Sequence, residues 1–111
     1  MIAPFLATVL SLGAPEPSAY DEAQDRALDN LADISAMSAL CPGSRVDRTM
    51  TDEVFDLYDL GNGGRRELAK RSKRQRARMA EFTTETACRA AWFLYGPDGI
   101  NIKNFILFGN R

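Results

Sequence analysis

The 111-residue chain is 45% hydrophobic and 26% charged, a composition typical of one small folded domain. It has no histidine and only two cysteines, so it lacks the commonest general base and cannot by itself supply four nitrogen or sulfur ligands to zinc. The net charge of −1 conceals an asymmetry: residues 1–64 hold eleven acids and three bases, whereas residues 65–78 hold eight bases and one acid, giving local charges of −8 and +7. We expect no cofactor and no metal.

An apolar run of eleven residues, 2–12, opens the chain and is followed by a turn-rich stretch that ends in Ser18 and Ala19. This is the layout of a secretory signal peptide, and the run is too short to span a bilayer. The pattern predicts a signal peptide over 1–19, a single helical domain over 20–111, and a location in the periplasm or outside the cell. The alternative is a cytoplasmic protein whose apolar arm packs on the fold, because no Lys or Arg precedes the run and Pro17 lies close to the cleavage position.

Apolar spacing predicts a first helix over about 19–41, with Ser18 as its N-cap. Leu31, Ile34 and Cys41 fall on one face of this helix, and Pro42 follows directly where the helix must end. Because the cap precedes Tyr20, cleavage after Ala19 would remove it.

A second, shorter helix is predicted over about 51–60. Thr49 or Thr51 would cap it, and the acids Asp52 and Glu53 suit its first turn. The segment 61–64, which reads Gly-Asn-Gly-Gly, is expected to be a turn that separates this helix from the next.

One long helix is predicted over 65–95, because one face is formed by residues that follow one another at intervals of three or four. These residues are Leu68, Ser72, Gln75, Met79, Phe82, Thr86, Ala90 and Phe93. Its first half is basic and nearly without large apolar residues. Its second half is apolar on most sides, so we expect that half to lie in the core. The basic half carries the candidate partner-binding residues, which are Arg65, Arg66, Lys70, Arg71, Lys73, Arg74, Arg76 and Arg78.

Beyond the turn at 96–99, the remaining apolar residues, from Ile100 to Phe108, form a C-terminal tail. The tail is either a short helix capped by Asp98 or an extended strip laid across the helices. The predicted fold class is therefore all-α, a small bundle of three main helices with an apolar C-terminal tail.

The two cysteines are predicted to form a disulfide between Cys41 and Cys88. Each lies in an apolar part of a predicted helix, and antiparallel packing of those helices would bring the sulfur atoms together. One alternative is that both cysteines are buried free thiols. A redox-active pair is much less favoured, because the sequence has no Cys-x-x-Cys spacing.

The basic run from Arg65 to Arg78 indicates contact with something acidic. A protein partner is the leading interpretation, next to internal pairing with the chain's own acidic helices. An anionic membrane surface and nucleic acid are alternative partners for the basic run. Binding to nucleic acid would imply a cytoplasmic protein that uses the helix over 65–78. The run contains no interleaved aromatic residues to stack on bases.

No pattern in the sequence indicates an enzyme or a small-molecule substrate. Asp52, Asp56 and Asp59 share one side of the second predicted helix, as a solvated acidic face also would. Trp92 and Tyr95 are expected in the core rather than at a binding surface. We therefore predict an exported, non-enzymatic protein that binds another macromolecule, as a small chaperone, an inhibitor, an immunity protein or an accessory subunit does.

The layout of this small helical domain, with one cysteine pair about fifty residues apart, is similar to that of the HdeA-type periplasmic acid chaperones. The similarity concerns layout alone. No motif around Cys41 or Cys88 matches, so no residue role is inferred from it.

Overall fold

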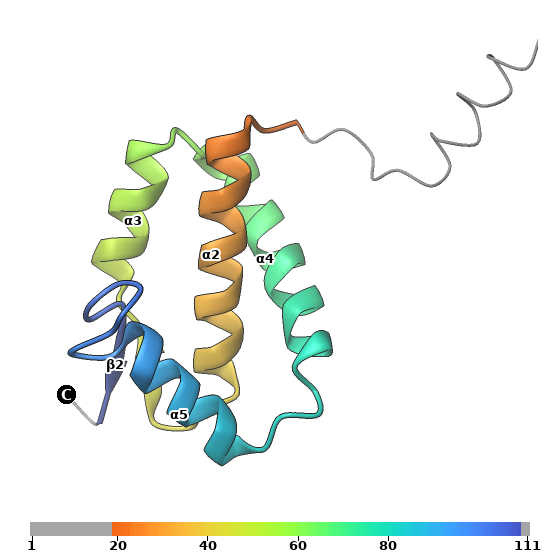
Figure 1. The fold of residues 1–111 in the computed structure, drawn as a ribbon. Helices are drawn as coiled ribbons and strands as arrows, with labels where there is room; N and C mark the ends of the chain where they lie inside the picture. Colours follow the sequence, from red (N-terminus) through yellow and green to blue (C-terminus); the bar gives the residue numbers. More distant parts are fainter. Residues whose placement is uncertain (1–18, 110–111) are drawn as a thin grey trace, which may run out of the picture.

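The computed structural model describes residues 19–109. Within this range the chain forms four helices and a two-stranded sheet (Figure 1). The elements in order are α2 (Glu22–Ala39), β1 (Ser44–Val46), α3 (Arg48–Leu57), α4 (Gly61–Arg78), α5 (Thr84–Tyr95) and β2 (Ile106–Phe108). The predicted helical class is thus confirmed, while the prediction of three helices without strands is wrong. The apolar run at 2–12 and nearly all of the predicted signal peptide lie outside the described residues.

Helix α2 is the central element of the fold: it stands between α3 and α4, and α5 lies across its C-terminal end (Figure 1). Its Leu28 and Ile34 are completely buried and form the centre of the core. The N-cap is Asp21, whose side chain accepts a hydrogen bond from the Gln24 backbone while the Gln24 side chain accepts one from the Asp21 backbone. This capping box satisfies two N–H groups of the helix end. Since Asp21 follows Ala19, the cap would survive cleavage there; the predicted cap Ser18 lies outside the described residues.

Helix α3 begins three residues earlier than predicted, because Asp47 rather than a threonine caps it. The Asp47 carboxylate accepts a hydrogen bond of 3.1 Å from the backbone N–H of Met50. Phe55 is the buried residue of α3 and anchors the helix on the core. After α3, Asp59 adopts a positive φ of 53° and the chain turns directly into α4.

The glycine-rich segment 61–64 was predicted to be a turn, and this prediction is wrong: it forms the first turn of α4. Packing overrides the low helix propensity of glycine here. A Cβ atom placed on Gly64 would lie 2.7 Å from the Cβ of Leu60 and 3.3 Å from Cε2 of Phe55. Gly64 therefore allows the start of α4 to lie directly against the end of α3.

The neighbouring glycines of α4 provide a matched test of this close contact. We expect Gly64→Ala to lower the free energy of unfolding by about 2 kcal/mol, because the added methyl group overpacks the contact with Leu60 and Phe55. A Cβ atom on Gly63 would meet its nearest neighbour, the Tyr20 hydroxyl, at an ordinary 3.7 Å. Gly63→Ala should therefore raise stability by about 0.5 kcal/mol through helix propensity. Urea denaturation of both variants checks this pair, and equal effects would contradict the close packing.

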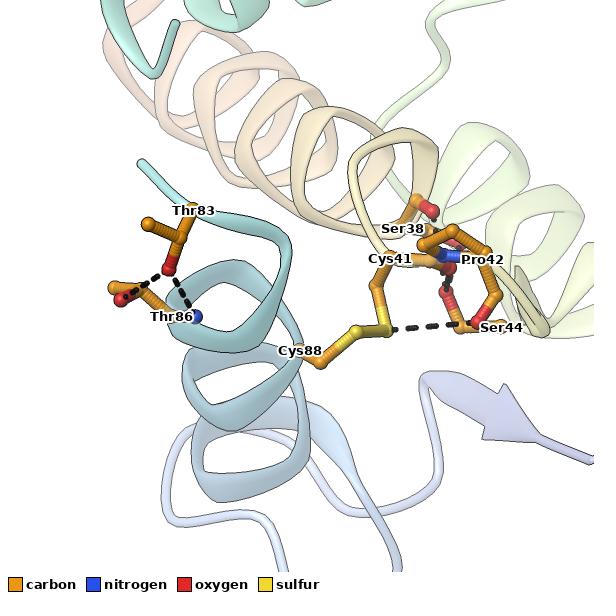
Figure 2. Close-up of a disulfide and its surroundings, with 7 residues drawn as sticks. All are labelled: Ser38, Cys41, Pro42, Ser44, Thr83, Thr86 and Cys88. Carbon is orange, nitrogen blue, oxygen red and sulfur yellow. Dashed lines mark hydrogen bonds between the residues drawn. A yellow bond between two sulfur atoms is a disulfide. The ribbon is translucent and has the colours of Figure 1, made fainter. Parts of the chain in front are cut away.

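The single long helix predicted over 65–95 is in fact two helices, α4 and α5, separated by residues 79–83. Thr83 caps α5, because its hydroxyl oxygen accepts a hydrogen bond of 3.1 Å from the backbone N–H of Thr86 (Figure 2). Met79 is buried at the end of α4, whereas Phe82 in the connection is exposed. The break lets α5 change direction and pack across the end of α2.

The predicted disulfide is confirmed: Cys41, just after α2, is bonded to Cys88 in α5, with the two Cα atoms 4.9 Å apart (Figure 2). Cys41 is buried and Cys88 is half-buried. The turn that carries Cys41 is held by Ser44, whose hydroxyl oxygen lies 2.7 Å from the Cys41 carbonyl oxygen and 3.0 Å from the Ser38 hydroxyl. The disulfide thus joins α5 to a turn that is itself well ordered by hydrogen bonds.

Of the two predicted forms of the C-terminal tail, a short helix and an extended strip, the structure shows the extended strip. The tail ends in a strand. Ile106–Phe108 pairs antiparallel with Ser44–Val46, with Arg45 opposite Leu107. Before the strand, the loop folds back on α5: the backbone N–H groups of Ile100 and Ile102 donate to carbonyl oxygens of α5. Phe105 and Ile106 then enter the core, so the tail contributes to the core of the domain.

Candidate partner-binding surface

Arg71 faces inward from α4 and is held by three carboxylates. Its Nε donates to Glu67 at 2.8 Å, its Nη2 to Asp25 at 2.9 Å and its Nη1 to Asp29 at 3.0 Å. Only 14% of the side chain is exposed. Because Asp25 and Asp29 belong to α2, one guanidinium joins the acidic helix to the basic helix and is not available to a partner.

The Arg71 cluster changes the ionisation of its members. The hydrogen bond from Arg71 is the largest influence on Glu67 and, together with the nearby positive charges, lowers the pKa of that carboxyl group. Burial alone would lower the pKa of Arg71, but its hydrogen bonds to Glu67 and Asp25 and the charge of Asp29 outweigh burial and raise it. Both shifts favour the charged pair, so the cluster is at its most stable when Glu67 is ionised.

The direction of the Glu67 shift predicts how stability depends on pH. Because the folded-state pKa lies below the ordinary value, the contribution of Glu67 is fully present above that ordinary value and is lost as the pH falls through the folded value. As the pH is lowered from about 5 to about 3, we expect the urea concentration at the unfolding midpoint to decrease. The decrease should be smaller in Glu67→Gln, because that variant has no carboxyl group to protonate at this position. A variant with an unchanged slope would contradict this role, and Glu53→Gln on the exposed side of α3 serves as the control.

Three further residues of the predicted basic set also have contacts within the domain. Arg65 donates to Asp52 of α3 at 2.9 Å and its guanidinium lies 4.4 Å from the centre of the Phe55 ring. Lys70 lies 3.8 Å from Glu67, and Arg78 contacts the Gln75 side chain at 3.5 Å. These contacts are exposed and therefore weak, although that of Arg65 joins α4 to α3.

The side of α4 that faces away from α2 carries an exposed line of cations. Arg66, Lys70, Lys73 and Arg76 follow one another at intervals of four, three and three residues, so they share one side of the helix, and all four are exposed. Among the described residues, Arg66, Lys73 and Arg76 form no ion pair. We call these four residues the outer basic face. The basic run is thus divided between internal pairing and a free surface.

The remaining two residues of the set, Arg74 and Arg78, lie on the flank of α4 that borders α2. There they line a hollow together with Asp29 and Asp33 of α2. The eight predicted residues therefore do not form one site: Arg71 lies inside, Arg65 contacts α3, four residues form the outer basic face, and two border the hollow.

The acidic residues considered for catalysis are not gathered into a site. Asp52 pairs with Arg65, while Asp56 and Asp59 are exposed. Within residues 19–109, no group of three or more Cys, Asp or Glu side chains is arranged to hold a metal ion. Asp56 and Asp59 therefore belong to an acidic surface at the C-terminal end of α3.

Helix α5 departs from the sequence prediction in a second way. Ala87, Ala91 and Tyr95 are buried as expected, but Trp92 and Phe93 are 54% and 60% exposed, so their assignment to the core is wrong. Trp92 packs edge to face on Phe108 at 5.0 Å between ring centres, next to a shallow hollow of about 540 Å³ that includes the disulfide. The break after Met79 rotates α5 relative to α4, and so the face inferred for a continuous helix does not hold beyond it.

No helix among the described residues is long and apolar enough to cross a membrane. Comparison with protein-family models, with curated proteins and with solved structures gives no match.

Proposed function

We propose that this chain is an exported, non-enzymatic helical protein that binds an acidic protein partner, as a chaperone, an inhibitor, an immunity protein or an accessory subunit does. The observation that carries the proposal is the outer basic face of α4, formed by Arg66, Lys70, Lys73 and Arg76. Binding through this face would leave the core and the disulfide unchanged.

The outer basic face is unfavourable for the isolated domain, which supports a binding role. Like charges three or four residues apart destabilise a helix by about 0.2–0.5 kcal/mol per pair. The face contains three such successive pairs, and Lys70 alone lies near an acid, Glu67, at 3.8 Å. An acidic partner would relieve this repulsion. Residues that break a local rule in this way are commonly functional.

Two features support export. The layout of residues 1–19 is that of a signal peptide. The disulfide between Cys41 and Cys88 would persist in an oxidising compartment and would be reduced in most cytoplasms. The same disulfide disfavours the alternative of a cytoplasmic nucleic-acid-binding protein. The exposed residues between the cations of α4 include Ala69 and Ala77, which cannot stack on bases.

Site-specific photo-crosslinking in the protein's own cells tests the proposal. A photoreactive residue replacing Lys73 should give a protein adduct in the periplasmic or secreted fraction, and one replacing Asp56 on α3 should not. Changing Arg66, Lys70 and Arg76 to Glu should abolish the adduct, because an acidic partner would then be repelled. An adduct with RNA or DNA, or an intact mass showing the full-length chain in the cytosol, would contradict the proposal.

A further inference from the structure

A small hollow between α2 and α4 has walls of opposite charge. It has a volume of about 260 Å³, with Asp29 and Asp33 on the α2 side and Arg74 and Arg78 on the α4 side. Ala32, Arg71 and Gln75 complete its lining. This volume is below that of most small-molecule pockets and suits the ends of one or two side chains.

Asp33 is the unusual residue on the acidic wall. It is half-buried, and among the described residues it forms no hydrogen bond and no ion pair within 4 Å. Burial, and to a lesser extent the charge of Asp29, raises the pKa of Asp33 despite the opposing charge of Arg78. A partly desolvated carboxylate that lacks a close partner is unfavourable unless a cation is supplied from outside.

The basic wall is similarly incomplete. Arg74 has no hydrogen-bond or ion-pair partner among the described residues, and Arg78 reaches only the Gln75 side chain, at 3.5 Å. This contrasts with Arg71, one turn away, whose donors are occupied by Glu67, Asp25 and Asp29. Two guanidinium groups and one carboxylate thus border a common space without neutralising one another closely.

We infer that this hollow receives a peptide segment of the protein partner that carries both a carboxylate, placed against Arg74 and Arg78, and a basic side chain, placed against Asp33. The inference deepens the proposed function and rests on it in taking the occupant to be part of a protein. A guanidinium pair one helical turn apart suits a carboxylate, and Asp33 suits an ammonium or guanidinium group.

The acidic wall is also the reason to favour a peptide over nucleic acid. A phosphate backbone laid along the flank of α4 could pair with Arg74 and Arg78, but it would also place negative charge next to Asp29 and Asp33 and would bring no cation for them. In addition, the residues that line the hollow include no aromatic side chain for a base to stack on. A segment of mixed charge satisfies both walls at once.

Titration with two capped peptides, followed by NMR of the Asp carboxyl carbons and Arg Nε signals of the full domain, tests the inference. The probes are hexaglutamate and the same peptide with one internal glutamate replaced by lysine. We expect the lysine-containing peptide to bind about threefold more tightly, against the trend set by its lower negative charge, and to shift the signals of Asp33, Arg74 and Arg78. Asp33→Asn should remove the difference in affinity between the two peptides. The double variant Arg74→Gln with Arg78→Gln should bind the lysine-containing peptide more weakly. The control Asp56→Asn should change neither the affinity difference nor the binding of the lysine-containing peptide.

The outcomes separate this inference from the proposed function. If hexaglutamate perturbs the outer basic face and the lysine-containing peptide leaves the Asp33 signal unmoved, the inference is overturned and the proposed function stands. If neither peptide shifts the Nε signals of Arg66 and Arg76 but binding of the lysine-containing peptide still depends on Asp33, the outer basic face fails and the hollow stands. Tighter binding of oligothymidylate than of either peptide would overturn the inference in favour of nucleic acid.

Discussion

Replacing Cys41 and Cys88 together with alanine should lower the free energy of unfolding by about 4 kcal/mol, the chain-entropy value for a loop of this length. The two cysteines are 47 residues apart in sequence, so the unfolded chain gains considerable freedom when the bond is absent. A small domain has a total stability of only about 5–15 kcal/mol, so this is a large share. Urea denaturation under oxidising conditions measures the loss.

The effect should be greatest in α5, because few of its side chains reach the core. Ala87, Ala91 and Tyr95 are its buried residues, and two of them are small. We therefore expect amide hydrogen exchange in α5 to rise more than exchange in α2 when the bond is removed. Wild-type protein treated with reductant should match the variant, and the variant should not respond to reductant. A loss below about 1 kcal/mol would show that packing, rather than the disulfide, holds α5 in place.

The disulfide could be predicted although the helix that carries Cys88 was not predicted correctly. The prediction needed only that both cysteines belong to apolar segments and that their number is even. Those properties belong to short stretches of sequence around Cys41 and Cys88. They did not change when the long helix proved to be two helices, so the pairing remained correct.

The helix break was harder to predict because apolar spacing continues through it. Met79 and Phe82 are three residues apart, as they would be on one face of a continuous helix, yet Met79 is buried and Phe82 is exposed. The local signal was present in Thr83, which caps α5, and in Thr86 three residues later. Periodicity favours a continuous helix, whereas capping chemistry marks its true start, and here the capping signal is the correct one.

Other features depend on contacts between distant residues. Gly64 became helical because Leu60 and Phe55 lie against it, which glycine propensity alone cannot show. The two paired strands lie about sixty positions apart in the sequence. Each strand has only three residues, which is too few to show the alternation of apolar and polar residues that marks a strand. In the candidate site, the basic character of α4 was evident from sequence, but which cation faces inward was not.

One signal could have identified Arg71 as the internal residue. Asp25 and Asp29 are one helical turn apart on the first predicted helix, and Arg71 is three residues from Leu68 and four from Gln75, on the side of α4 that faces that helix. A guanidinium with two carboxylates opposite it and a third, Glu67, one turn away is placed for internal pairing. The pairing depended on the relative position of two helices, which sequence spacing does not supply.

Arg71→Met should lower the free energy of unfolding by about 2 kcal/mol, because it leaves Asp25 and Glu67 partly buried without their shared cation. The value is below the usual 3–5 kcal/mol for a broken buried pair, since Asp29 is largely exposed and water can compensate there. The free energy of unfolding of Arg71→Lys should lie between those of Arg71→Met and the wild type. The lysine keeps the positive charge, but its ammonium group cannot donate along all three directions of the guanidinium. Urea denaturation at neutral pH gives both values.

Lys73→Met is the matched control, since Lys73 is an exposed cation two residues away on the outer basic face. It should change stability by less than about 0.5 kcal/mol, as surface substitutions usually do. The cluster also predicts coupling: Asp25→Asn combined with Arg71→Met should cost less than the sum of the two single changes by about 1 kcal/mol. Additive effects would show that Arg71 acts through packing alone. If stability depends on Arg71 and partner binding depends on Lys73, then the two kinds of cation on α4 have separate roles, which the charge of the basic run does not reveal.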